Sequence, residues 1–181
     1  MIATTSNNMI FQWATPRNLS AGSIQLLKEL SRDVRWGICR YAGPESVVKP
    51  GDEVLLSARP VSAFFELDGE VMGNASDKSC LAYKRDGKLH ATGKTILYSW
   101  LEEPEEKTES GIVLVRKVTT REMEPRWAKV HACGPETGVQ EGDEILIMFK
   151  ADAYKIEGVL DGVTLHNAGA EEVILYRRVA A

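Results

Sequence analysis

The 181-residue chain lacks the residue patterns that mark the common classes of soluble enzyme. Its three histidines, His90, His131 and His166, do not have the HExxH spacing that binds zinc. It contains no GxxxxGK[ST], GxGxxG or GxSxG sequence, so no phosphate loop, dinucleotide fingerprint or nucleophile elbow is indicated. The sequence therefore predicts a protein that is not an enzyme and uses no metal or cofactor.

Cysteines are also few. Cys39, Cys80 and Cys133 are odd in number, widely spaced and not arranged as CxxC. Cys39 and Cys133 lie in apolar segments typical of strands, where a free thiol behaves as a small hydrophobe. This pattern favours free thiols in a reducing compartment over a disulfide framework.

A basic surface and a long apolar run are missing too. The net charge of −4 argues against a nucleic-acid-binding face, which would be basic. No apolar stretch approaches the roughly 18 residues that span a bilayer. The first residues lack the charged and apolar regions of a signal peptide. We therefore expect a cytoplasmic protein that binds neither nucleic acid nor membrane.

The sequence does contain an internal repeat. Residues 36–56 (WGICRYAGPESVVKPGDEVLL) and 127–147 (WAKVHACGPETGVQEGDEILI) align at an offset of 91, with nine of 21 positions identical. Both copies hold Gly-Pro-Glu and Gly-Asp-Glu at the same spacing. Repetition of this kind indicates a duplicated structural unit.

The similarity extends to both flanks of this segment. Residues 10–13 parallel 97–100 at an offset of 87, and residues 83–85 parallel 176–178 at an offset of 93. The change in offset places insertions in the loops, which tolerate them. We therefore predict two domains, 1–88 and 89–181, with the boundary within the polar stretch 85–93 and a turn at Asp86-Gly87.

Short runs rich in Val, Ile and aromatic residues, separated by Gly, Pro and Asp, predict an all-β fold for each copy, as a small barrel or sandwich. The predicted strands of the second copy are Thr95–Trp100, Ile112–Val118, Trp127–Ala132, Glu144–Phe149, Ala153–Ile156 and Val173–Tyr176. One helix is possible in the first copy, over Ile24–Leu30. Asp52-Glu53 and Asp143-Glu144 stand in the repeated Gly-Asp turn, which favours a structural role over acid–base catalysis.

The segment 101–126 is the most unusual part of the chain. It opens with five glutamates around Pro104 and then presents the apolar run Ile112-Val113-Leu114 after Gly111. One interpretation is a buried strand that follows a charged loop. The other is a mobile loop that inserts Ile112, Val113 and Leu114 into a groove of a partner, at an entropic cost that keeps release easy.

These residues resemble the co-chaperonin (GroES) family, particularly its phage-encoded members. The resemblance rests on the ordered motifs Ser110–Leu114, Val130–Pro135, Gly142–Leu146 and Glu171–Tyr176. It covers residues 89–181 and extends more weakly, through the duplication, to residues 8–88. It implies two tandem GroES-like Greek-key β-barrel domains, of which the second carries the candidate mobile loop 101–126 and the first is a degenerate copy.

The resemblance also implies a function and a set of partners. A co-chaperonin binds the apical domains of a chaperonin ring and caps the cavity in which client proteins fold, here including a viral capsid protein. The family's binding residues correspond to Gly111, Ile112, Val113 and Leu114. In the first copy the matching residues are Ile24, Leu26 and Leu27, where Gln25 interrupts the apolar run. The chain is then expected to form a homo-oligomer, as a ring, in the host cytoplasm.

A second hypothesis stays open at this point. The same fold could serve as a phage virion structural protein, a decoration or connector subunit, because a fold does not determine a function.

Overall fold

The strands form where the sequence alternates or concentrates β-branched and aromatic residues. The computed structural model describes residues 4–13, 35–57, 63–101, 125–148, 156–160 and 162–179. No α-helix occurs within these residues. The strands are β1 (Asn8–Trp13), β2 (Arg35–Ala42), β3 (Glu53–Leu56), β4 (Ala63–Leu67), β5 (Glu70–Ser76), β6 (Cys80–Arg85), β7 (Lys88–Ala91), β8 (Thr95–Trp100), β9 (Pro125–Cys133), β10 (Glu144–Met148), β11 (Ile156–Leu160), β12 (Val163–Gly169) and β13 (Val173–Arg177).

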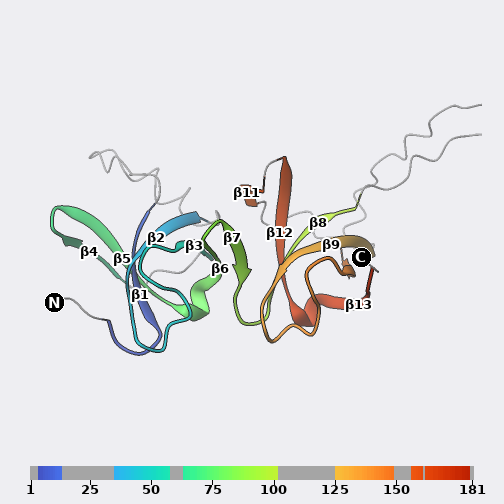
Figure 1. Cartoon of the computed structure of the whole chain (residues 1–181), viewed down its shortest axis with the longest axis horizontal. Helices are drawn as coiled ribbons and strands as arrows, with labels where there is room; N and C mark the ends of the chain where they lie inside the picture. The colour runs from blue at the N-terminus through green and yellow to red at the C-terminus, as the bar shows by residue number, and fades with distance from the viewer. Residues whose placement is uncertain are drawn as a thin grey trace, which may run out of the picture.

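Two antiparallel sheets contain all of these strands (Figure 1). The first has the order β4-β5-β1-β2-β3-β6-β7, and the second has the order β11-β12-β8-β9-β10-β13. Strands β1–β6, the first repeat, therefore follow the same order as β8–β13, the second repeat. A 3-10 turn precedes the last strand of each repeat, η1 (Asp77–Ser79) before β6 and η2 (Ala170–Glu172) before β13. The predicted all-β fold is confirmed.

Most of the predicted strands of the second repeat are present. β8 has the predicted bounds, and β9, β10 and β13 each begin or end within two residues of theirs. β12 was not predicted, because its alternating sequence VTLHNAG mixes polar and small residues. The predicted strand Ala153–Ile156 contributes only Ile156 to β11, since residues 153–155 lie outside the described residues. Ile112–Val118 and Ile24–Leu30 lie outside them as well.

β7 joins the two repeats. It forms a hairpin with β6, and the predicted turn at Asp86 and Gly87 is confirmed, with φ of 52° and 74°. The predicted boundary between residues 88 and 89 falls inside β7, which pairs with β6 in the first sheet. The chain enters the second sheet only at β8, after Ala91. In Figure 1, β7 lies on the side of the first sheet that is nearer to the second sheet.

The repeated Gly-Pro-Glu sequence makes the same turn in both repeats. The N–H of Gly43 donates to Asn8 O at 2.8 Å, and the N–H of Gly134 donates to Thr95 O at 2.8 Å. A Cβ on Gly43 would lie 2.0 Å from the carbonyl oxygen of Ser6. A Cβ on Gly134 would lie 2.2 Å from the carbonyl oxygen of Gly93. Glycine is required here because the turn crosses the start of the repeat's first strand at backbone contact.

The repeated Gly-Asp sequence also has one structural role in both places. Gly51 and Gly142 adopt φ of 95° and 91°, which glycine alone adopts without strain. Asp52 Oδ2 accepts the N–H of Lys49 at 2.7 Å, and Asp143 Oδ2 accepts the N–H of Gln140 at 2.8 Å. Both carboxylates are buried and close the turn that leads into β3 or β10.

Three clusters of buried apolar side chains hold the fold together. One lies inside the first repeat around Phe11 and Leu56, and a second lies inside the second repeat around Ile96 and Ile145. The third lies between the repeats and is formed by Leu55, Ala82, Ala91, Leu97, Ala132, Ile156 and Leu165, with Trp36, Leu81, Leu89 and Val163 at its margin. The two sheets therefore pack against each other through side chains from both. Within the described part of the chain, no helix is long and apolar enough to cross a membrane.

Candidate functional site

The predicted partner-binding residues lie outside the described residues. This applies to Gly111, Ile112, Val113 and Leu114, and also to Ile24, Leu26 and Leu27 of the first repeat. The structure does describe the strands that these two segments connect, and these strands fix where each segment begins and ends.

Residues 102–124 connect two neighbouring strands. Trp100, the last residue of β8, pairs with Ala128 of β9, and the N–H of Leu101 donates to Trp127 O at 3.1 Å. Pro125 and Arg126, which the predicted loop included, belong to β9. The candidate loop therefore leaves and rejoins the sheet at one point, the end of the β8–β9 pair.

The first repeat has the same arrangement. Trp13, the last residue of β1, pairs with Gly37 near the start of β2. Residues 14–34, which contain Ile24, Leu26 and Leu27, thus connect the equivalents of β8 and β9. The two segments that sequence reasoning singled out occupy equivalent positions in the two repeats.

Aromatic side chains secure the base of the candidate loop. The ring of Trp100 lies 5.1 Å from that of Tyr98, edge to face, and 5.7 Å from that of His166. Tyr98 and His166 stack at 5.6 Å. Burial raises the pKa of Tyr98 to about 12, so its hydroxyl is neutral at physiological pH. These ring contacts hold the Trp100 side chain against Tyr98 and His166 at the end of β8.

A contact between Ser99 and His131 was not predicted. Ser99 Oγ lies 2.8 Å from His131 Nε2 across β8 and β9. Burial lowers the pKa of His131, and Lys129 lowers it further, so the imidazole is neutral at pH 7. Within the described residues no carboxylate is hydrogen-bonded to this imidazole. Among the residues that the structure describes, the pair therefore has no third group of the kind that orients the base in Ser–His catalysis, and it is best explained as a cross-strand hydrogen bond.

The buried Asp52 carboxylate forms an ion pair that Asp143 does not form within the described residues. Arg85 Nη2 lies 2.6 Å from Asp52 Oδ2, and Arg85 Nε lies 3.0 Å from Oδ1. Burial acts to raise the pKa of Asp52, but the hydrogen bonds from Arg85 and Lys49 outweigh it and lower the pKa below its usual 3.8. The Asp52 and Asp143 carboxylates each close a Gly-Asp turn by accepting a backbone N–H, so they are poor candidates for acid–base chemistry.

Exposed large apolar side chains gather on two parts of the described surface. On β13 these are Ile174, Leu175 and Tyr176, which are 52%, 46% and 47% exposed. On the β4–β5 hairpin they are Phe64, Phe65 and Val71. Patches of this kind on a soluble protein mark surfaces that bind partners. Sequence reasoning missed both, although the unbroken apolar run Val173–Tyr176 is typical of a strand covered on both faces.

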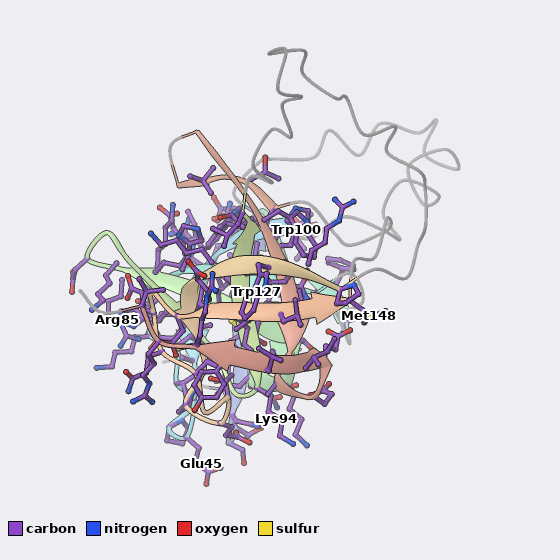
Figure 2. The ribbon with its side chains drawn as sticks, turned by 90° about the vertical axis from the view of Figure 1, so that its right-hand side faces the viewer. Glu45, Arg85, Lys94, Trp100, Trp127 and Met148 are labelled. Carbon is purple, nitrogen blue, oxygen red and sulfur yellow. The ribbon has the colours of Figure 1, made fainter. Side chains whose placement is uncertain are left out.

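The β13 patch continues onto the outer face of the second repeat. Leu146 of β10 pairs with Leu175 of β13 and with Trp127 of β9, so the three lie side by side on this face. The guanidinium of Arg177 lies over the Trp127 ring at 4.4 Å. Figure 2 looks onto this side of the molecule, with Trp127 near its centre and Trp100 and Met148 toward one end. We call Trp127, Leu146, Leu175 and Arg177 the outer face of the second repeat.

The described residues contain no group of three or more His, Cys, Asp or Glu side chains placed to hold a metal ion. No protein-family model matches the chain, and no curated protein matches its sequence.

Proposed function

We propose that the chain is a co-chaperonin of the GroES type, with two tandem Greek-key β-barrel domains over 1–88 and 89–181. The second domain binds the apical domains of a chaperonin ring through Ile112, Val113 and Leu114. The assembled chains cap the folding cavity, and client proteins, including a viral capsid protein, fold beneath the cap. The protein acts by binding and catalyses no reaction.

The observation that carries the proposal is the position of the two strand ends that residues 102–124 connect. The sequence of residues 102–124 combines an acidic approach with one short apolar run, and the strand ends on either side of it are paired with each other at the end of β8 and β9. A tethered apolar segment of this kind can reach a groove on a partner while the sheets remain as a fixed platform. Burying the three side chains supplies about 1.5–3 kcal/mol each, which suits reversible binding.

The difference between the repeats supports assigning the activity to the second. Both connecting segments leave from equivalent strand ends, but only residues 112–114 form an unbroken apolar run. In the first repeat, Gln25 stands between Ile24 and Leu26. A polar amide buried in an apolar groove without a partner loses much of the binding energy.

The test is capture of a chaperonin by the tagged chain in the presence of ATP or ADP. Ile112, Val113 and Leu114 are changed together to Ser, and the matched control changes Ile24, Leu26 and Leu27 to Ser. The first variant is expected to lose at least about 1,000-fold in affinity, and the control is expected to bind as the wild type does. Absence of a complex with the wild-type chain, or equal binding by all three proteins, contradicts the proposal. Recovery of the chain in stoichiometric amounts from purified phage particles would favour the virion structural role instead.

A further inference from the structure

The contact between the two repeats joins different surfaces. The first repeat contributes Leu55 of β3 and Ala82 of β6, and the joining strand β7 contributes Ala91. The second repeat contributes Leu97 of β8 and the pair Ile156 and Leu165 of β11 and β12. A contact of this kind is heterologous, so each repeat keeps one surface that its neighbour within the chain does not use.

The unused surface of the second repeat is its outer face. Leu146 pairs with Leu175 in the same register in which Leu55 pairs with Ala82 in the first repeat. Leu55 and Ala82 are 0% exposed because the second repeat covers them. Leu175 is 46% exposed and Leu146 is only partly buried. The same cross-strand pair is thus covered in one repeat and uncovered in the other.

The unused surface of the first repeat is the equivalent of the one that the second repeat presents to it. Phe65 pairs with Met72 on β4 and β5, as Ile156 pairs with Leu165 on β11 and β12. Ile156 is 3% exposed, whereas Phe65 is 37% exposed. Beside this pair, Ile10 of β1 is partly buried, whereas the equivalent Leu97 is 0% exposed. Met72 itself is only 5% exposed, so the uncovered side chains here are Ile10 and Phe65. We call Ile10, Phe65 and Met72 the outer face of the first repeat.

The two repeats also differ in the hydrogen bonds made along their last strands, β6 and β13. After β7, the N–H of Thr92 donates to Leu81 O at 3.0 Å, and its hydroxyl donates to Cys80 O. At the offset of 87, Thr92 corresponds to Thr5, which is exposed. The next residues, Gly93 and Ser6, have φ of 51° and 48°, so the backbone has the same local conformation in both places. β13, the equivalent of β6, is the last strand of its sheet and has no strand beside it among the described residues.

We propose that the outer face of the second repeat docks on the outer face of the first repeat of another copy of this chain. The docking repeats the contact that already joins the two repeats within a chain. Thr5 of the incoming copy then occupies, against β13, the position that Thr92 occupies against β6. This inference deepens the homo-oligomer in the proposed function and holds without any chaperonin.

The arrangement has a consequence for the chaperonin-binding segments. Chains added head to tail form a closed ring when the rotation between repeats closes. First and second repeats then alternate around the ring. The β8–β9 strand ends, which residues 102–124 connect, would then occur at every second position, with the β1–β2 strand ends between them.

The test uses two single substitutions, each with a control on the same protein. Leu175→Asp places a charge in the outer face of the second repeat, and Phe65→Asp places one in the outer face of the first. The controls are Val47→Asp and Phe64→Asp, at apolar side chains that are 50% and 54% exposed. Phe64 is the matched control for Phe65, because neighbouring residues of a strand point to opposite faces. Oligomeric mass is measured by analytical ultracentrifugation over a range of concentrations.

The wild type and both controls are expected to form the same closed oligomer. Each outer-face variant is expected to associate at least about 30-fold more weakly. An equimolar mixture of Leu175→Asp and Phe65→Asp chains is expected to form a complex of two chains and no larger species, since each chain keeps one intact face that fits the other chain. The two-chain complex also shows that both variants are folded.

Three outcomes overturn the proposal. One is a wild-type chain that stays monomeric at hundreds of micromolar. Another is a mixture of the two variants that yields no two-chain complex. The third is an oligomer that survives Phe65→Asp unchanged but is lost on Leu175→Asp, which would indicate a symmetric contact of the second repeat with itself. A chain that assembles as expected but fails to bind a chaperonin contradicts the proposed function and leaves this inference intact.

Discussion

Arg85 reaches from the end of β6 to the buried carboxylate of Asp52 and binds both of its oxygens, at 2.6 and 3.0 Å. The same guanidinium donates to Val47 O at 3.1 Å. This one side chain ties the last strand of the first repeat to the Gly-Asp turn and to the segment before it. In the second repeat the Gly-Asp turn is closed by Asp143 and the N–H of Gln140, without an arginine among the described residues.

Asp52→Asn is expected to lower the free energy of unfolding by about 2 kcal/mol at pH 7, because it removes a charge-assisted bidentate contact. The pKa of Asp52 is below 3.8 in the folded chain. Its contribution is therefore fully present above the unfolded-state pKa and is lost as the pH falls through the folded pKa. Denaturant unfolding of both proteins between pH 2.5 and pH 7 measures this, and the difference between the two free energies of unfolding should shrink toward the acid end.

Asp143→Asn is the matched control for this experiment. Asp143 is buried to the same extent but has only the Gln140 N–H as its hydrogen-bond donor among the described residues. Asp143→Asn should therefore lower the free energy of unfolding clearly less than Asp52→Asn does. Equal losses from the two substitutions, or a loss from Asp52→Asn that does not shrink at all as the pH falls below the unfolded-state pKa, would show that the ion pair does not provide the stabilisation.

Gly43→Ala and Gly134→Ala are each expected to lower the free energy of unfolding by at least about 2 kcal/mol. The reason is the 2.0 and 2.2 Å approach of a carbonyl oxygen to the Cβ that each substitution adds. Gly138→Ala is the control, because its Cβ would meet nothing within 4 Å and only the φ of 74° is unfavourable. It should cost about 1 kcal/mol. Thermal unfolding measures the loss of stability in the three variants. A smaller loss for Gly43→Ala and Gly134→Ala than for Gly138→Ala would refute the backbone-contact explanation.

The three thiols are expected to react at two different rates. Burial raises the pKa of both Cys39 and Cys80 to about 12, and both side chains lie in the core of the first repeat. Cys133 is only partly buried. A thiol-reactive chromophore at pH 8 should therefore modify Cys133 first, and Cys133→Ser should remove the fast phase. A fast phase that persists in that variant would place a reactive thiol in the first repeat.

Much of the fold could be predicted because the residues that are identical in the two repeats have strict backbone requirements. The Gly-Pro-Glu turn needs glycine for a close approach, and the Gly-Asp turn needs it for a positive φ. Both constraints appear in the sequence as identities at fixed spacing. The strand order, by contrast, depends on which edges pair, and short apolar runs carry no information about that.

The position of β7 shows the limit of prediction from repeat boundaries. Its residues follow the Asp86-Gly87 turn, and by the offset of 87 they correspond to residues 1–4 at the start of the first repeat. Pairing with β6 assigns β7 to the first sheet. A strand exchanged between neighbouring units cannot be recognised from periodicity, because the sequence shows the same residues whichever sheet they join.

The exposed faces were missed for a related reason. Leu146 and Leu175 have the same apolar character as the buried Leu55 and Ala82, so the sequence of the second repeat predicts a covered pair. Only the three-dimensional arrangement shows that one pair is covered within the chain and the other is not. For the partner-binding residues 111–114, the sequence remains the whole basis of the prediction.

The mass of the complex that the chain forms with a chaperonin tests the central claim most directly. The chaperonin ring, the wild-type chain and ATP are mixed, and the mass is measured by analytical ultracentrifugation with and without the chain. The proposal predicts a discrete increase equal to one closed oligomer per capped ring, which disappears when Ile112, Val113 and Leu114 are changed to Ser although the oligomer itself persists. An unchanged chaperonin mass in the presence of the assembled wild-type oligomer would contradict it.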